Sequence, residues 1–95
     1  MTDTRTIPLS RGYVATVDTD DYDWLSMFKW SALVVKGNAY AVRLRKGRTL
    51  YMHRDIVRCE SHLNVVHDNR DSLDNRRGNL VPMTASQRAK WVVAQ

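Results

Sequence analysis

Two turn signals, Lys36-Gly37-Asn38 and Lys46-Gly47, divide the middle of the chain into three short runs of strand-like composition. A lysine-glycine pair between two such runs suits the tight connection of antiparallel strands. The runs at 30–35, 39–45 and 49–52 therefore predict a three-stranded antiparallel sheet in which each strand pairs with the next one along the chain.

The middle run of this sheet has two different faces. Because successive side chains of a strand point to opposite faces, Tyr40, Val42 and Leu44 share one face, which we expect to be core. The other face is basic together with the turn that follows it, which suits the phosphates of a nucleic acid; a solvated sheet face without a ligand is the alternative. This face holds Ala41, Arg43 and Arg45, and the basic patch consists of Arg43, Arg45, Lys46 and Arg48.

The segment before the sheet predicts a hairpin and a helix. Residues 6–16 alternate loosely around a Ser10-Arg11-Gly12 turn, as the two strands of a hairpin do. The acidic run at 18–21 supplies candidates for a helix N-cap, so we expect a helix over 21–28. Its core-facing residues are Trp24, Leu25 and Phe28.

The segment after the sheet predicts a second short helix, over residues 52–59. Met52, Ile56 and Val57 give this helix one apolar side. We interpret His53, at its start, as a packed or capping residue.

Cys59 is the only cysteine, which excludes an intramolecular disulfide and a four-cysteine zinc site. The spacing of Cys59, His62 and His67 offers three zinc ligands, but a closed structural site needs four, so we do not expect zinc.

The length of 95 residues and the hydrophobic fraction of 43% predict one folded domain, 1–95, with a modest core. Its first region, 1–52, holds the strands and the first helix, and its second region is 53–95. The N-terminal segment lacks the apolar run of a signal peptide, and no run approaches the roughly 18 apolar residues of a membrane span. We expect a soluble, cytoplasmic protein.

The excess of positive over negative charge is confined to the second part of the chain. Residues 1–42 carry four Lys/Arg and five Asp/Glu, while residues 43–95 carry eleven and five, so the two parts have net charges of −1 and +6. Such a basic part favours a polyanionic partner, most often nucleic acid.

Three segments in the second region form a recognisable motif. They are MHR at 52–54, VVHDNRDSLDNRRGNL at 65–80 and TASQ at 84–87. The chain thereby resembles the HNH endonucleases of phages and mobile introns, among them homing endonucleases, in which these segments commonly read MHR, VDHINGDxLDNRRxNLR and TxxQN. The stretches IPLSRGYVATVD, DYDWLSMFKW and YAVR are similar to the part that precedes this motif in the same proteins, so the resemblance covers nearly the whole chain.

The resemblance implies an α+β fold in which a small antiparallel sheet region is followed by a ββα-metal motif. In such a motif a neutral imidazole takes a proton from the attacking water, and a divalent cation, Mg²⁺ or Mn²⁺, stabilises the leaving oxygen. By position, His67 matches the general base. Asn79 matches the central asparagine that braces the loop, and Asp74-Asn75-Arg76 match the loop itself. On independent grounds, the spacing of Thr84 and Gln87 is that of a capping box, so we expect a helix running towards Val93, with Trp91 and Val92 closing the core.

The departures from the family pattern fall on the metal ligands. Val66 stands where the family has an aspartate, and Arg88 stands where it has His or Asn. Neither side chain can ligate a hard cation. Either a neighbouring carboxylate rebuilds the metal site, for which Asp68, Asp71 and Asp74 are the candidates, or the protein uses no metal and Arg88 binds a phosphate in place of the cation.

Three functions remain open. The first is an HNH endonuclease that nicks DNA with His67 as its base and an altered metal site. The second is an inactive HNH fold, with a degenerate active site, that binds nucleic acid, which we expect to be double-stranded DNA. The third is a module that inhibits a host protein, for which the acidic run 18–23 or the basic face is the docking surface. The candidate nucleic-acid-binding residues are Arg43, Arg45, Arg48, Arg70, Arg76, Arg77, Arg88 and Lys90.

Overall fold

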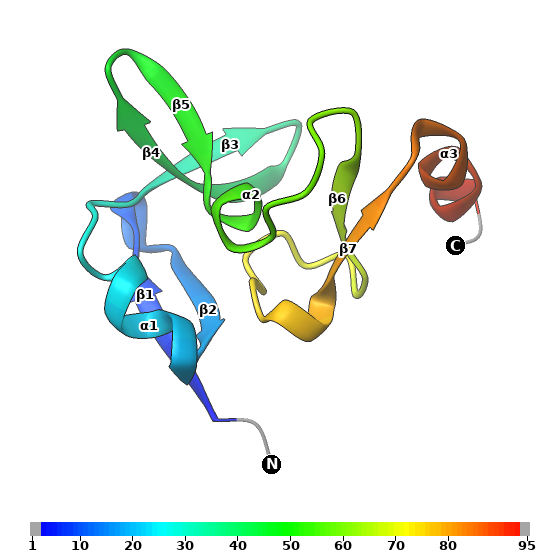
Figure 1. Cartoon of the computed structure of the whole chain (residues 1–95). Coiled ribbons are helices and arrows are strands. Elements are labelled where there is room, and N and C mark those ends of the chain that lie inside the picture. The colour runs from blue at the N-terminus through cyan, green and yellow to red at the C-terminus, as the bar shows by residue number, and fades with distance from the viewer. Residues whose placement is uncertain (1–2, 94–95) are drawn as a thin grey trace.

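A computed structural model describes residues 3–93. Within this range the chain forms seven strands in three small antiparallel sheets, together with three α-helices, so the α+β class is confirmed (Figure 1). None of these helices is long and apolar enough to cross a membrane.

The first unit is a hairpin followed by a helix. Strands β1 (Thr4–Pro8) and β2 (Val14–Asp18) pair on either side of a short 3-10 turn (Ser10–Gly12), as predicted. Helix α1 (Thr19–Leu25) follows directly and ends before the predicted residue 28.

The second unit is the predicted three-stranded meander. Strands β3 (Ser31–Val35), β4 (Asn38–Arg45) and β5 (Arg48–Tyr51) lie in the order β3-β4-β5. Both turns contain a lysine and a glycine with positive φ, which is the backbone geometry of a tight hairpin connection. Helix α2 (Met52–Ile56) begins where β5 ends and is shorter than predicted.

The third unit is a strand pair followed by a helix. Strands β6 (Asn64–His67) and β7 (Leu80–Met83) are antiparallel, with His67 opposite Leu80, and a loop that contains a 3-10 turn (Arg77–Asn79) connects them. Helix α3 (Ala85–Val93) starts at the predicted capping box, in which Thr84 and Gln87 exchange two hydrogen bonds of 2.9 and 3.1 Å. In Figure 1, α3 lies at the opposite end of the molecule from α1.

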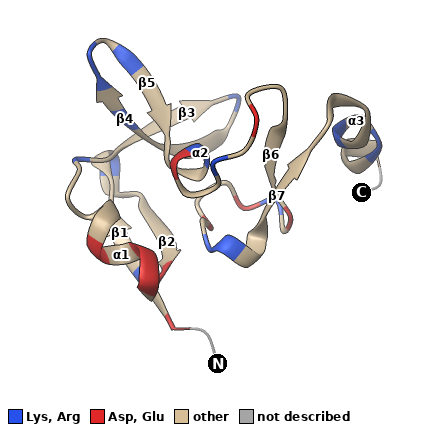
Figure 2. Cartoon of the chain, in the orientation of Figure 1, with Lys and Arg blue, Asp and Glu red and all other residues tan. Residues whose placement is uncertain are grey.

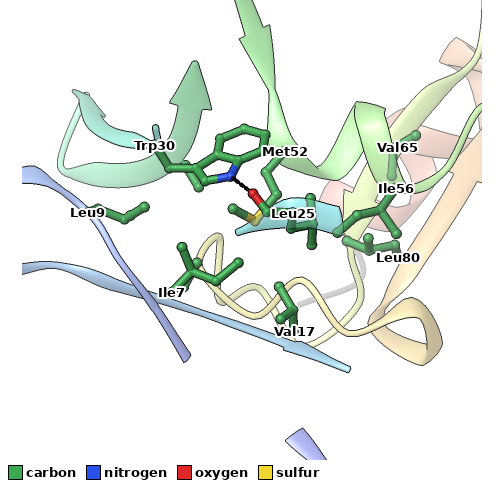
Figure 3. Packing of buried hydrophobic residues seen from close by; sticks show 11 residues of the cluster. Ile7, Leu9, Val17, Leu25, Trp30, Met52, Ile56, Val65 and Leu80 are labelled. Atoms are coloured by element: carbon green, nitrogen blue, oxygen red, sulfur yellow. Dashed lines mark hydrogen bonds between the residues drawn. The ribbon is translucent and has the colours of Figure 1, made fainter. Parts of the chain in front are cut away.

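One core joins all three units. Leu25, Met52 and Val17 are fully buried, and they pack with residues from β1, β6 and β7 (Figure 3). Trp30 closes the core next to α1, because its indole nitrogen donates to the Leu25 carbonyl at 2.8 Å. Burying each large apolar side chain contributes about 1.5–3 kcal/mol, so the units stabilise one another through this shared contact.

The prediction for the faces of β4 is confirmed for Val42, which is 7% exposed, and is wrong for Leu44, which is 75% exposed. Ala41 belongs to the core cluster, so the face that was expected to be basic also packs into the core. The reason is that Ala41 is small enough to lie in the packed layer, while Arg43 extends over the Phe28 ring at 4.0 Å and pairs with Asp55 at 2.9 Å. Tyr40, on the other face, is only half-buried.

Helix α3 also differs from the prediction. None of its described residues is buried, and Val92 is 42% exposed, so Trp91 and Val92 do not close the core. Trp91 instead packs against Arg70, whose guanidinium carbon lies 4.1 Å from the centre of the indole ring.

Candidate functional site

The residues of the motif gather around the loop 68–79, between β6 and β7. The backbone N–H of Asp68 donates to the carbonyl of Asn79 at 2.8 Å, which extends the strand pairing by one step and closes the base of the loop. Inside the loop, the Asn79 side chain donates to the Asp74 carbonyl at 2.9 Å and to the Asn69 side chain at 3.0 Å. It also accepts the Asn69 backbone N–H at 2.9 Å. A single buried amide thus joins both sides of the loop.

His67 lies at the end of β6 and is only 7% exposed. Its Nε2 lies 2.8 Å from Oδ1 of Asn75. Which of the two ring nitrogens carries the hydrogen follows from the tautomer of the ring. Burial lowers the pKa of His67, although the bond to Asn75 and the nearby carboxylates of Asp71 and Asp74 act in the opposite direction.

Asn75 was expected only as part of the motif loop, and the structure gives it a contact of its own with the histidine. It is 1% exposed, its backbone N–H donates to the Thr16 carbonyl at 2.7 Å, and its Nδ2 has no hydrogen-bond partner among the described residues. The signal that could have found it is its place in the sequence LDNRR, beside Asp74.

His53 packs directly on His67, with ring centres 4.9 Å apart. Burial, with smaller contributions from His67 and Arg54, lowers the pKa of His53 to about 4. The imidazole is therefore neutral at pH 7, which agrees with its interpretation as a packed residue.

His67 and His53 line a cleft of about 950 Å³ between the meander, β6 and α3. Three arginines, Arg54, Arg70 and Arg88, line it as well, and no Asp or Glu is among its lining residues. Arg54 is partly engaged, because it donates to the Leu63 carbonyl at 2.7 Å. The cleft is therefore positively charged and suits an anionic ligand.

The side chains at the expected metal position do not fit a divalent cation. Val66 is a buried valine, and Arg88 is a cation. Of the carboxylates that could replace the missing ligand, Asp74 is held by two hydrogen bonds from Arg76, which lower its pKa, and Asp68 and Asp71 are exposed. Over residues 3–93 no three side chains of His, Cys, Asp or Glu lie close enough together to hold a metal ion. Cys59, His62 and His67 therefore do not form a cluster of ligands.

The eight basic residues singled out in the sequence fall into two groups. Three pair with carboxylates inside the molecule: Arg43 with Asp55, Arg76 with Asp74 and Arg77 with Asp21. The other five are exposed and form no ion pair with the described residues. Arg45 and Arg48 stand at the tip of the β4–β5 hairpin, Arg70 and Arg88 line the cleft, and Lys90 lies on α3. Figure 2 shows basic segments on this hairpin and on α3.

The pair of Arg77 and Asp21 belongs to a clamp between the N-terminal unit and the loop. Arg77 donates twice to Asp21, each time at 2.8 Å, and its backbone N–H donates to the Asp18 side chain at 2.9 Å. Next to it, Thr16 and Leu73 are joined by a backbone hydrogen bond of 2.8 Å. Asp18 therefore does not cap α1 with its side chain, and two carboxylates of the acidic run face the protein itself.

Comparison of the chain with models of known protein families, with curated proteins and with solved structures found no match. The assignment of a function therefore depends on the motif residues and on the geometry of this site.

Proposed function

We propose that this chain is a nucleic-acid-binding domain that uses an HNH-type strand, loop and helix to place arginines on a phosphate backbone. The observation that carries the proposal is the cleft of about 950 Å³, which is lined, among residues 3–93, by three arginines and by no Asp or Glu. The resemblance to HNH endonucleases supports it, because the order β6, loop 68–79, β7 and α3 is the order that the resemblance implies.

Arg88 has the central part in this function. It lines the cleft on α3, at the position where the related endonucleases hold a metal ligand. A guanidinium binds phosphate oxygens through two parallel N–H groups, so it neutralises the charge that a cation would neutralise in a nuclease. Arg45, Lys46 and Arg48 add a second basic site at the exposed tip of the β4–β5 hairpin, which Figure 2 shows projecting from the body.

Binding is tested with a fluorescently labelled oligonucleotide in EDTA, at several salt concentrations. We expect affinity without a divalent cation and a linear fall of log K with log salt. Arg88→Gln should weaken binding and reduce this slope by about one. The matched control is Arg58→Gln, an exposed arginine outside the cleft, which should leave both quantities unchanged. Binding that is absent in EDTA, or that does not respond to Arg88→Gln, contradicts the proposal.

A second candidate, a DNA-nicking endonuclease, is favoured by one observation. His67 is held by Asn75, and burial lowers its pKa, which favours the neutral imidazole that a general base requires. Supercoiled plasmid is incubated with the protein and Mg²⁺, Mn²⁺, Ni²⁺ or Zn²⁺. Nicking that is lost in His67→Ala assigns the nuclease, whereas nicking that appears only in the double variant Val66→Asp, Arg88→Asn shows a site that has exchanged cleavage for binding.

A further inference from the structure

The cleft contains a row of aromatic rings in addition to its arginines. Tyr40 and Tyr51, on β4 and β5, have ring centres 5.9 Å apart, and Tyr51 lies 5.5 Å from His53. His53 continues the row to His67 at 4.9 Å. The planes of these neighbours cross at 61° to 82°, so each pair meets edge to face, while Tyr40 and His53, with ring centres 6.3 Å apart, are tilted by 43°.

The side of the cleft formed by α3 adds Trp91. This ring is half-buried, although none of the described residues of α3 belongs to the core. Arg70 lies over the ring, and its Nη2 donates to the Trp91 carbonyl at 2.7 Å. A large aromatic side chain, held in place beside an arginine at the edge of a charged cleft, is a platform for a flat ligand.

The backbone of Arg70 has a conformation that residues other than glycine rarely adopt. Its φ is 65°, in the left-handed region where any residue other than glycine is strained. The same region of φ is occupied at the turn residues Lys36 and Lys46, so the angle marks a turn, and the contacts with Trp91 are what tie the Arg70 side chain to the cleft.

These features distinguish between paired and unpaired nucleic acid. In a duplex the bases stack on one another and present only their edges, so aromatic side chains cannot reach their faces. Unpaired bases stack on Tyr, Trp, Phe and His rings, while arginines track the phosphates. The volume of about 950 Å³ is at the upper end of the range of ligand pockets, roughly 300–1,000 Å³.

We infer that the cleft binds unpaired nucleotides, with bases against Tyr40, Tyr51 and Trp91 and phosphates against Arg70 and Arg88. This inference rests on the proposed function and makes it more specific, because it replaces the expected double-stranded DNA with single-stranded or locally opened nucleic acid. The charge of the site then comes from the arginines, and the recognition of flat bases comes from the rings.

The test compares labelled strands of about 12 nucleotides, oligo-dT and oligo-U, with a duplex of the same length, by fluorescence anisotropy in EDTA. We expect either single strand to bind at least about tenfold more tightly than the duplex. Tyr40→Leu and Trp91→Leu should each weaken single-strand binding about 5- to 100-fold, whereas Tyr40→Phe and Trp91→Phe should retain it. Phe28→Leu is the matched control, because Phe28 is an exposed aromatic outside this cleft.

Two further measurements separate binding from folding. Arg70→Gly removes the guanidinium and its contacts with Trp91, so it should bind the single strand more weakly while its circular dichroism spectrum shows the fold of the parent. A strand that contains 2-aminopurine should lose fluorescence on binding to the parent protein, because a stacked base is quenched. Unchanged emission overturns the inference.

The outcomes distinguish the two proposals. One outcome is salt-dependent binding that is tighter for the duplex and is unchanged in Tyr40→Leu and Trp91→Leu. This outcome overturns the binding of unpaired nucleotides and leaves the proposed nucleic-acid function in place. Failure to bind any of the three oligonucleotides overturns both.

Discussion

At the scale of single residues, the buried His53 ring couples stability to pH. Its pKa is about 4 in the folded protein against an ordinary value of 6.5, so the unfolded chain binds a proton in this window that the folded chain does not. The free energy of unfolding therefore falls as the pH is lowered from 6.5 to 4, by on the order of 3 kcal/mol. Burial of His67 acts in the same direction.

We predict that His53→Phe, which keeps a ring but cannot be protonated, reduces the loss of stability between pH 7 and pH 5. Urea unfolding at the two pH values measures it. His62→Gln, which changes an exposed histidine, is the control and should show the same loss as the parent. An equal loss in His53→Phe and the parent would contradict the assignment of this pH dependence to His53.

At the scale of elements, the β4–β5 hairpin depends on one glycine. Lys46 and Gly47 both have positive φ, of 50° and 78°, and a β-carbon at position 47 would be strained by this backbone angle. We predict that Gly47→Ala costs about 1 kcal/mol, or about 4–8 °C in melting temperature. Gly78→Ala is the matched control, because Gly78 has no positive φ and open space around a new β-carbon, so its melting temperature should stay within a degree or two of the parent. A similar decrease in both variants would show that the turn is not the cause.

Elements were predictable from the sequence where the signal is local. The two lysine-glycine turns and the Thr84–Gln87 capping box set their own geometry, and the hairpins and the start of α3 follow from them. The direction in which β4 faces was not predictable, because alternation defines two faces without saying which of them meets the core. Hydrophobicity identified the buried Val42 but missed Ala41, which belongs to the core although its neighbour on the same face, Arg43, is charged.

At the scale of the whole molecule, the clamp joins the acidic N-terminal unit to the loop of the site. Asp21 is 3% exposed, and the hydrogen bonds from Arg77, more than any other contact, lower its pKa. We predict that Asp21→Asn lowers the free energy of unfolding by about 2 kcal/mol, which chemical denaturation at pH 7 measures. Because a lowered pKa stabilises the folded state only above the pKa of the unfolded chain, the difference between parent and variant should shrink as the pH falls below about 4.

The matched control for this prediction is Asp23→Asn, an exposed aspartate on the same helix. If it were as destabilising as Asp21→Asn, the loss of negative charge on α1, and not the clamp, would be the cause. Sequence analysis had no means to pair Asp21 with Arg77, because 56 residues separate them and neither position carries a local signal for the other. The same distance explains why Arg77 was interpreted as a contact for nucleic acid.

The shared core also has a consequence for the way in which the chain is made. Leu80 packs in the same cluster as Ile7, and Asn75 holds Thr16, so the first strands acquire their final neighbours only when the last quarter of the chain is available. A ribosome supplies residues from the N-terminus at roughly 5–20 per second, so β1, β2 and α1 wait for several seconds with apolar surface uncovered. Contacts between such distant residues are also slow to form, which makes the nascent chain a target for chaperones during this interval.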